Sequence, residues 1–202
     1  MTIASVARVP DLHKSAFWIY GVAAMVMREP LAVVLRHANT AGWGDPGVHI
    51  EALRGLIVWM LLSRQFTVAG VYFDHVYLQP DSAERYPRRS YPLDFLIGVG
   101  ALLAAVATST LVQADNHLFN AVVGVALGWD VVWLLVAALM RHSSVSLIVP
   151  ETVASLVMIV VGGVTLAVFG QLAAYVAVLA CILLHLGRLM AAYDKLYAVP
   201  RT

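Results

Sequence analysis

The chain has 202 residues, of which 61% are hydrophobic and 12% are charged, and its formal net charge at pH 7 is +1. Soluble domains carry about twice this share of charged residues, so a soluble globular fold is excluded. No run of basic residues alternates with aromatic ones, which excludes a nucleic-acid-binding surface.

The apolar residues are gathered in long blocks, and about 20 such residues are what a helix needs to cross the hydrocarbon core of a bilayer. Because lipid offers no partner to unpaired backbone groups, each block is predicted to be a helix. We therefore expect an all-α, polytopic integral membrane protein with one transmembrane domain over residues 1–202. The six predicted spans cover residues 15–37, 50–77, 93–112, 118–140, 151–169 and 172–193.

The first predicted span is interrupted near its middle by Arg28-Glu29-Pro30. Proline removes a backbone hydrogen bond and clashes with the preceding turn, so a kink or break is expected at Pro30. Broken helices at mid-membrane expose backbone polar groups to the substrate in many transporters. The alternative is that the residues before Arg28 form a short interfacial helix, in which case the first crossing is 50–77.

The starts of two later spans carry the residues that helix starts prefer. Tyr91-Pro92-Leu93-Asp94 places a proline and then an acidic residue in the first turn of span 93–112. Pro150-Glu151 is interpreted in the same way, as the start of span 151–169. This interpretation assigns Asp94 and Glu151 to helix ends.

The basic residues predict the orientation of the chain. With six spans, one side of the membrane collects most of them, namely Arg8, Lys14, Arg85, Arg88, Arg89, Arg141, Lys195 and Arg201. Basic loops remain on the cytoplasmic side, so both termini are expected to be cytoplasmic, in the inner membrane.

Five charged or titratable side chains lie inside the predicted spans: Arg28, Glu29, Arg64, Asp130 and His185. Counting residues from the cytoplasmic ends places all of them at a similar depth, near the middle of the membrane. Arg188 lies one turn from His185 on the same helix face. Unpaired charges at this depth cost several kcal/mol, so these side chains are predicted to face one another inside the bundle.

The expected pairs are Arg64 with Asp130, and Glu29 with Arg28 or Arg188. His185 is expected to join the same cluster, and histidine is the side chain that most readily changes its charge near neutral pH. This combination suits a proton relay or an ion-coupled site. The competing interpretation is structural, because buried arginine–aspartate pairs also fix helix register and a buried histidine can be a satisfied core residue.

Other constellations are weaker. His75 and His142 share the cytoplasmic edge and are weak candidates for a bis-histidine haem site, so the cofactor stays unassigned. Cys181 is the single cysteine, and no metal site is predicted. No nucleophile or phosphate-binding motif is present, and an enzyme acting on lipid headgroups is the third interpretation. Its residues would be Asp74, His75, Arg88, Arg89 and Asp94.

The sequence therefore favours a small ion- or proton-linked transporter or channel component whose site is the central polar cluster. The alternative is a non-catalytic anchoring or scaffold subunit of a larger membrane complex, including one that carries pigment, haem or quinone. In that case the same charges act as pins between helices. The expected partners are the lipid bilayer and either further copies of this chain or other membrane subunits, and no nucleic acid.

Overall fold

The computed structural model describes residues 28–197, except for the side chains of Glu29 and of residues 192–197. The described part is helical and contains no strand, which confirms the all-α prediction. Its elements are α2 (Arg28–Ala41), α3 (Pro46–Phe73), the π-helical turn η2 (Asp74–Leu78), α4 (Ser82–Arg85), α5 (Tyr91–Ser109), α6 (Asn116–Leu139), α7 (Val145–Phe169) and α8 (Gln171–Tyr197).

Five helices in the described part are long and apolar enough to cross a membrane, and they correspond to the last five predicted spans. The chain is therefore an integral membrane protein. The first predicted span, 15–37, is covered only in part, because residues 15–27 lie outside the described residues. Residues 28–41 form α2, with Pro30 in its first turn, so the expected kink and the sixth span stay predictions.

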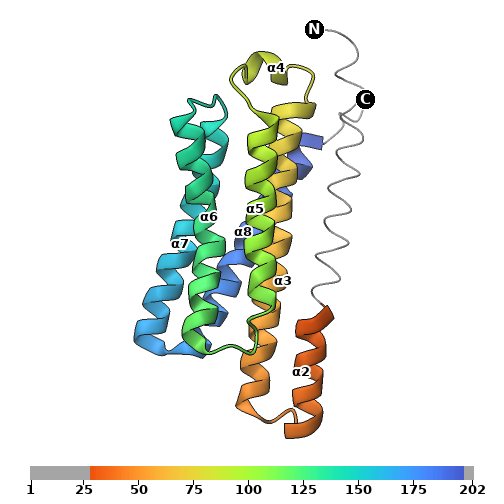
Figure 1. The fold of residues 1–202 in the computed structure, drawn as a ribbon, viewed down its shortest axis with the longest axis vertical. Coiled ribbons are helices and arrows are strands. Elements are labelled where there is room, and N and C mark those ends of the chain that lie inside the picture. Colours follow the sequence, from red (N-terminus) through yellow and green to blue (C-terminus); the bar gives the residue numbers. More distant parts are fainter. Residues whose placement is uncertain (1–27, 198–202) are drawn as a thin grey trace.

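The five long helices run alternately up and down and enclose a common interior (Figure 1). α3 packs against α5 and α8, α7 packs against α6 and α8, and α5 packs against α6, which closes the ring. Helix α2 packs against the lower part of α3 and extends with it beyond the lower ends of the other helices (Figure 1).

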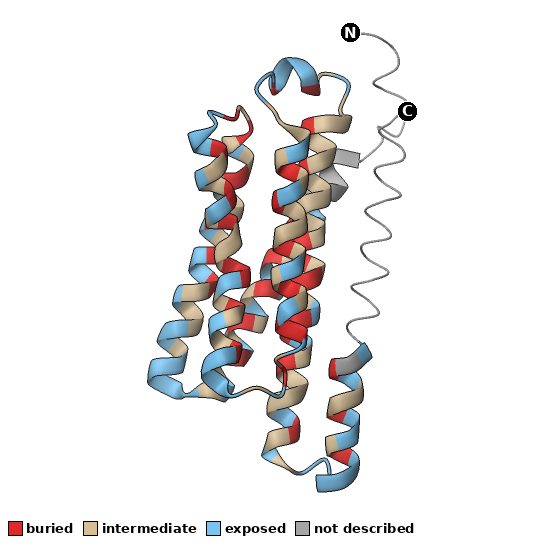
Figure 2. Cartoon of the chain, viewed as in Figure 1, coloured by how far each residue is buried: buried red, intermediate tan, exposed pale blue. Residues whose placement is uncertain are grey.

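The interior consists of two apolar layers. The lower layer includes Leu61, Phe119 and Ile182, and the upper layer includes Trp133 and Ile148. Buried residues face the interior of the ring, whereas the outer surfaces are exposed, most clearly on the lower half of α7 (Figure 2). Those outer surfaces carry leucine and valine, as lipid-facing helices do. The residues between the two apolar layers are polar.

One predicted boundary is wrong, and the error matters for the site. α7 begins at Val145, and Pro150 lies inside the helix instead of at its start. Residues 145–149 are mostly apolar, and in lipid the loss of one backbone hydrogen bond at proline costs less than leaving a whole segment unpaired. Glu151 therefore lies within the bundle and not at its rim.

Candidate functional site

Arg64 and Asp130 meet between the two apolar layers. Arg64 Nη2 lies 2.8 Å from Asp130 Oδ2, and both side chains are almost completely buried, at 0% and 1% exposure. Ser155 on α7 joins them, because its hydroxyl accepts from Arg64 Nη2 at 2.7 Å and donates to Asp130 Oδ2 at 2.6 Å. The pairing expected from the sequence is present, and it connects α3, α6 and α7.

A second pair lies next to the first. His185 Nε2 on α8 is 2.7 Å from Glu151 Oε2 on α7, and both side chains are largely buried. The two pairs are linked through the backbone, since Arg64 Nη2 also donates to the Glu151 carbonyl at 3.3 Å. We call Arg64, Asp130, Glu151, Ser155 and His185 the central network. Its members come from four of the five long helices.

Glu151 and His185 form an acid–base pair beside the Arg64–Asp130 ion pair. A proton between a carboxylate oxygen and an imidazole nitrogen that lie 2.7 Å apart makes a hydrogen bond whichever of the two atoms holds it. The arrangement can therefore hold a proton between α7 and α8, inside an apolar bundle.

Arg64 has unused hydrogen-bonding capacity. Among the residues that the structure describes, neither its Nε nor its Nη1 has a hydrogen-bond partner, although both atoms are buried. Buried donors of a charged group are normally satisfied, because leaving them without an acceptor costs about 1–3 kcal/mol or more. An unsatisfied donor in a native protein suggests a functional role or an ordered water.

The structure does not bring Arg28 or Arg188 into the central network. Arg28 is exposed at the start of α2, where its neighbour Pro30 lies beside Gly55, well below Arg64 on α3. Arg188 is exposed on α8, because a long side chain one turn beyond His185 can extend out of the bundle. The Glu29 side chain lies outside the described part, so its pairing stays a prediction.

The upper end of the bundle contains a second buried carboxylate. Asp94 is 1% exposed and accepts from the hydroxyls of Tyr72 at 3.0 Å and Tyr77 at 2.6 Å. The indole N–H of Trp133 points to its other oxygen at 3.4 Å. Ser144 connects the Tyr72 hydroxyl to His142 Nδ1, at 2.5 and 2.6 Å. Asp94 lies in the first turn of α5 as predicted, but it holds several helices together from there.

The same contacts define the environment of the two edge histidines. His142 Nε2 accepts the backbone N–H of Ser90 at 2.8 Å, and Nδ1 is engaged by Ser144, so both ring nitrogens of this buried residue are occupied. His75 Nδ1 is buried without a partner within residues 28–197. A haem between them would have to displace the contacts of His142.

The lower end of the bundle is held by Arg54. Its guanidinium donates to the carbonyls of Val112 and Ala114, both at 2.8 Å, to the Tyr175 hydroxyl at 2.9 Å and to the Asn116 side chain. It also lies 4.9 Å from the centre of the Phe119 ring. Arg54 therefore ties the α5–α6 connection to α3 and α8.

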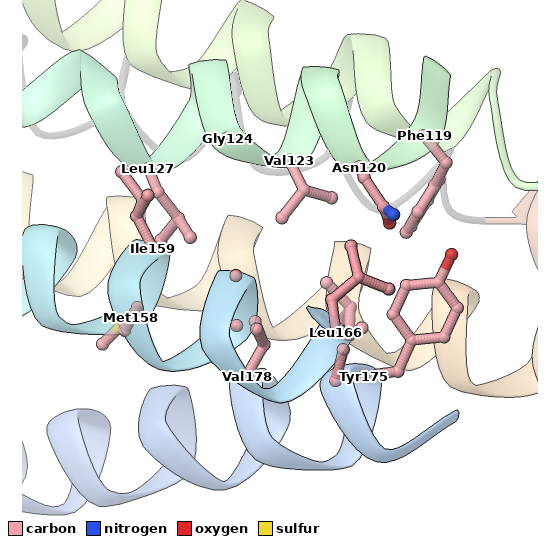
Figure 3. Close-up of a pocket in the computed structure, with 14 residues that line it drawn as sticks. Phe119, Asn120, Val123, Gly124, Leu127, Met158, Ile159, Leu166, Tyr175 and Val178 are labelled. Carbon is pink, nitrogen blue, oxygen red and sulfur yellow. The ribbon is translucent and has the colours of Figure 1, made fainter. Parts of the chain in front are cut away.

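A cavity of about 210 Å³ lies in the lower layer, between α3, α6, α7 and α8 (Figure 3). Apolar side chains line most of it. Asn120 and Tyr175 lie toward one end, and Leu127 and Met158 toward the other (Figure 3). Leu127 is one turn from Asp130 on α6, and Met158 is one turn from Ser155 on α7. The cavity thus ends about one helical turn from the central network.

Two participants were not identified from the sequence. The Pro150-Glu151 pattern predicts a helix start at Glu151, although an acidic residue beside a long apolar block also signals a buried partner. Ser155 gave no signal, because an isolated serine is common in apolar helices. Its role follows only from the packing of α7 beside α3 and α6. In comparisons with known proteins, no family model, no curated protein and no solved structure matches this chain.

Proposed function

We propose that the protein is a proton-linked membrane transporter or channel component in which the Glu151–His185 pair carries the transported or coupling proton. The observation that carries this proposal is the 2.7 Å contact of a buried carboxylate with a buried imidazole, beside an arginine whose Nε and Nη1 have no hydrogen-bond partner among the residues that the structure describes. Ionisable groups that face the interior of a membrane bundle are typical of proton relays.

The two pairs have different roles in this proposal. Arg64 and Asp130 keep their charges and hold α3, α6 and α7 together through Ser155. Glu151 and His185 gain and lose one proton. When Glu151 loses its proton to His185 or to water, the spare N–H groups of Arg64 offer a partner for the negative charge after a small side-chain movement. Arg64 then couples proton binding to the position of α7.

The bundle also differs on the two sides of the central network. The lower side contains the cavity, whereas the upper side is filled by apolar and aromatic residues, including Trp133 and Ile148. In our proposal the lower side gives access to the network in this conformation, and the upper side is closed. The basic residues Arg85, Arg88, Arg89 and Arg141 lie at the upper end, which we take to be cytoplasmic.

The proposal can be tested without knowing a substrate, by measuring charge movement on proton binding. Proteoliposomes are adsorbed on a gold-supported membrane and exposed to a rapid pH change. Because the pair is buried in the bundle, a proton that reaches it crosses part of the membrane and gives a transient current. We expect this current in the wild type and its loss in Glu151→Gln and His185→Gln.

Arg188→Gln is the matched control, because Arg188 is on the same helix as His185 but is exposed. Its transient should equal that of the wild type. A transient that persists in Glu151→Gln would overturn the proposal. The absence of a transient in a folded wild type would favour the scaffold interpretation, in which the charges only pin helices together.

A further inference from the structure

We infer that the cavity in the lower layer is a binding site for a neutral, ring-sized molecule that has an apolar body and one hydrogen-bond acceptor. The inference that this molecule is the substrate of the transporter rests on the proposed function. The inference that the molecule binds here rests only on the cavity, which has a volume of about 210 Å³.

Size and lining define the body of the ligand. An apolar cavity of about 150 Å³ is large enough to bind benzene, so the space here accommodates an aromatic ring with a short substituent. Ile57, Val123, Leu127 and Met158 contribute apolar side chains to the wall, and no charged residue lines the cavity within the described part. A charged ligand would lose its hydration without a counter-charge, which excludes ions as occupants.

The polar end of the cavity defines the acceptor. The Asn120 amide points into the space between α6 and α8, near Tyr175 (Figure 3). Asn120 exchanges two hydrogen bonds with Gln171, at 3.2 and 2.9 Å, which leaves one N–H on Nδ2 to donate. The Tyr175 hydroxyl accepts from Arg54 and keeps its own O–H to donate. Both groups match a carbonyl or ether oxygen on the ligand.

Glycine creates the space on α6 and α7. A Cβ on Gly124 or on Gly163 would meet no atom within 4 Å, and both residues line the cavity. A Cβ on Gly162 would instead lie 2.7 Å from Val178, so this glycine allows α7 and α8 to approach each other. A Cβ on Gly128, one turn further along α6, would also meet no atom within 4 Å, so Gly124 differs from Gly128 in that it lines the cavity.

The test uses para-fluoroacetophenone, a neutral ring with one carbonyl acceptor, and fluorine NMR on protein in lipid nanodiscs. We expect saturable binding to the wild type and affinity lower by about tenfold or more in Gly124→Leu, which fills the cavity. Gly128→Leu is the matched control, because it makes the same change one turn away, where a Cβ also meets no atom within 4 Å. Its affinity should stay within about twofold of the wild type.

A second probe tests the acceptor. Para-fluoroethylbenzene has the same ring without the carbonyl, so the wild type should prefer the ketone by about tenfold. Asn120→Leu should reduce this preference, because it removes one of the two donors, and it should still bind the hydrocarbon probe. If Gly124→Leu fails to fold, Gly163→Leu fills the same space from α7 and should give the same loss. Equal binding of both probes to the wild type would overturn the acceptor assignment.

Other outcomes separate this inference from the proposed function. Signals that match empty nanodiscs, or that do not saturate, would mean that the probes only partition into lipid, and would overturn the binding site. Loss of binding alongside an intact pH-jump current would overturn the cavity and leave the proton site standing. Binding without any pH-jump current would overturn the proposed function and the substrate role, and leave a binding site.

Discussion

Arg54 and Arg64 lie on the same helix, and both are buried, but their surroundings differ. Three nitrogens of Arg54 donate to neutral oxygens, and its guanidinium stacks on aromatic rings. Arg64 directs a single nitrogen toward a carboxylate, a hydroxyl and a carbonyl. Its other two nitrogens have no partner in the part of the chain that the structure describes.

Arg54 therefore has a structural role, whereas Arg64 has donor groups that no acceptor within the described residues uses. Arg54 has no counter-ion within the described part of the chain and needs none there, because the carbonyls after α5 are the natural acceptors for a cation. Its bonds would be lost in any movement, so it holds the lower end of the bundle fixed. Arg64 can exchange acceptors without leaving its pocket. Helix α3 therefore combines a fixed end with an adaptable centre.

The largest effect should come from removing one charge of the central pair. Arg64→Ala leaves Asp130 as a buried charge without its counter-ion, which typically costs about 3–5 kcal/mol. We expect a correspondingly lower melting temperature in detergent and poor expression. The Arg64→Ala/Asp130→Ala double variant should regain more than half of the loss, because no charge is left unpaired. If the double variant is less stable than either single one, the pair is not the source of the effect.

Arg54→Lys should have a smaller effect, because the groups that lose their partner are neutral. Lysine keeps the charge but cannot reproduce the fork of N–H donors that reaches Val112, Ala114 and Asn116 at once. We expect a loss of about 2–3 kcal/mol in stability, measured by thermal unfolding, with an unchanged pH-jump current. A lost current with intact stability would contradict the division between a fixed end and an adaptable centre.

Asp94→Asn tests whether the upper end is fixed in the same manner. The amide oxygen of asparagine can replace one carboxylate oxygen, but its NH₂ group would face O–H and N–H donors of Tyr72, Tyr77 or Trp133. We expect a loss of about 1–2 kcal/mol in stability, since one buried donor is left without an acceptor. Tyr77→Phe, which removes only one donor, should cost less. A loss as large as that of Arg64→Ala would place a second essential charge at this end.

Much of the fold could be predicted because lipid restricts the chain so strongly. Long apolar blocks must be helices, and the five described spans were found to within a few residues at most ends. Pro150 is the exception, because its preference for helix starts was outweighed by the need to keep 145–149 helical in lipid. At this position the preference of proline predicts a helix start at Pro150, whereas the membrane environment favours a helix that already includes residues 145–149.

The central network could be predicted in part. Charges inside apolar blocks must find each other, which is enough to pair Arg64 with Asp130. It does not tell which of several acidic residues His185 meets, because that depends on the rotation of α7 against α8. The buried state of Arg54 was missed for a related reason. Its acceptors are mainly backbone carbonyls, which any residue provides and no sequence pattern marks.

The smallest effect concerns Asp115, which caps α6 between two of the groups that Arg54 holds. The Leu118 backbone N–H donates to Asp115 Oδ1 at 2.9 Å and holds the pKa of this carboxyl below its usual value. A lowered folded pKa means that the cap stabilises the protein above the unfolded pKa, and that this contribution is lost as the pH falls through the folded pKa. Asp115→Asn keeps the cap without a titrating group.

The difference in melting temperature between the wild type and Asp115→Asn should therefore change by a small amount in this acidic window and remain constant above it. The contacts of Arg54 on either side of Asp115 should also affect this measurement. If Arg54 fixes the α5–α6 connection, Ala114 and Asn116 stay in place when Asp115 is protonated, and the effect remains local. In an Arg54→Lys background the connection is free to move, so the pH-dependent difference should grow. An unchanged difference would mean that Arg54 and Asp115 stabilise the start of α6 independently.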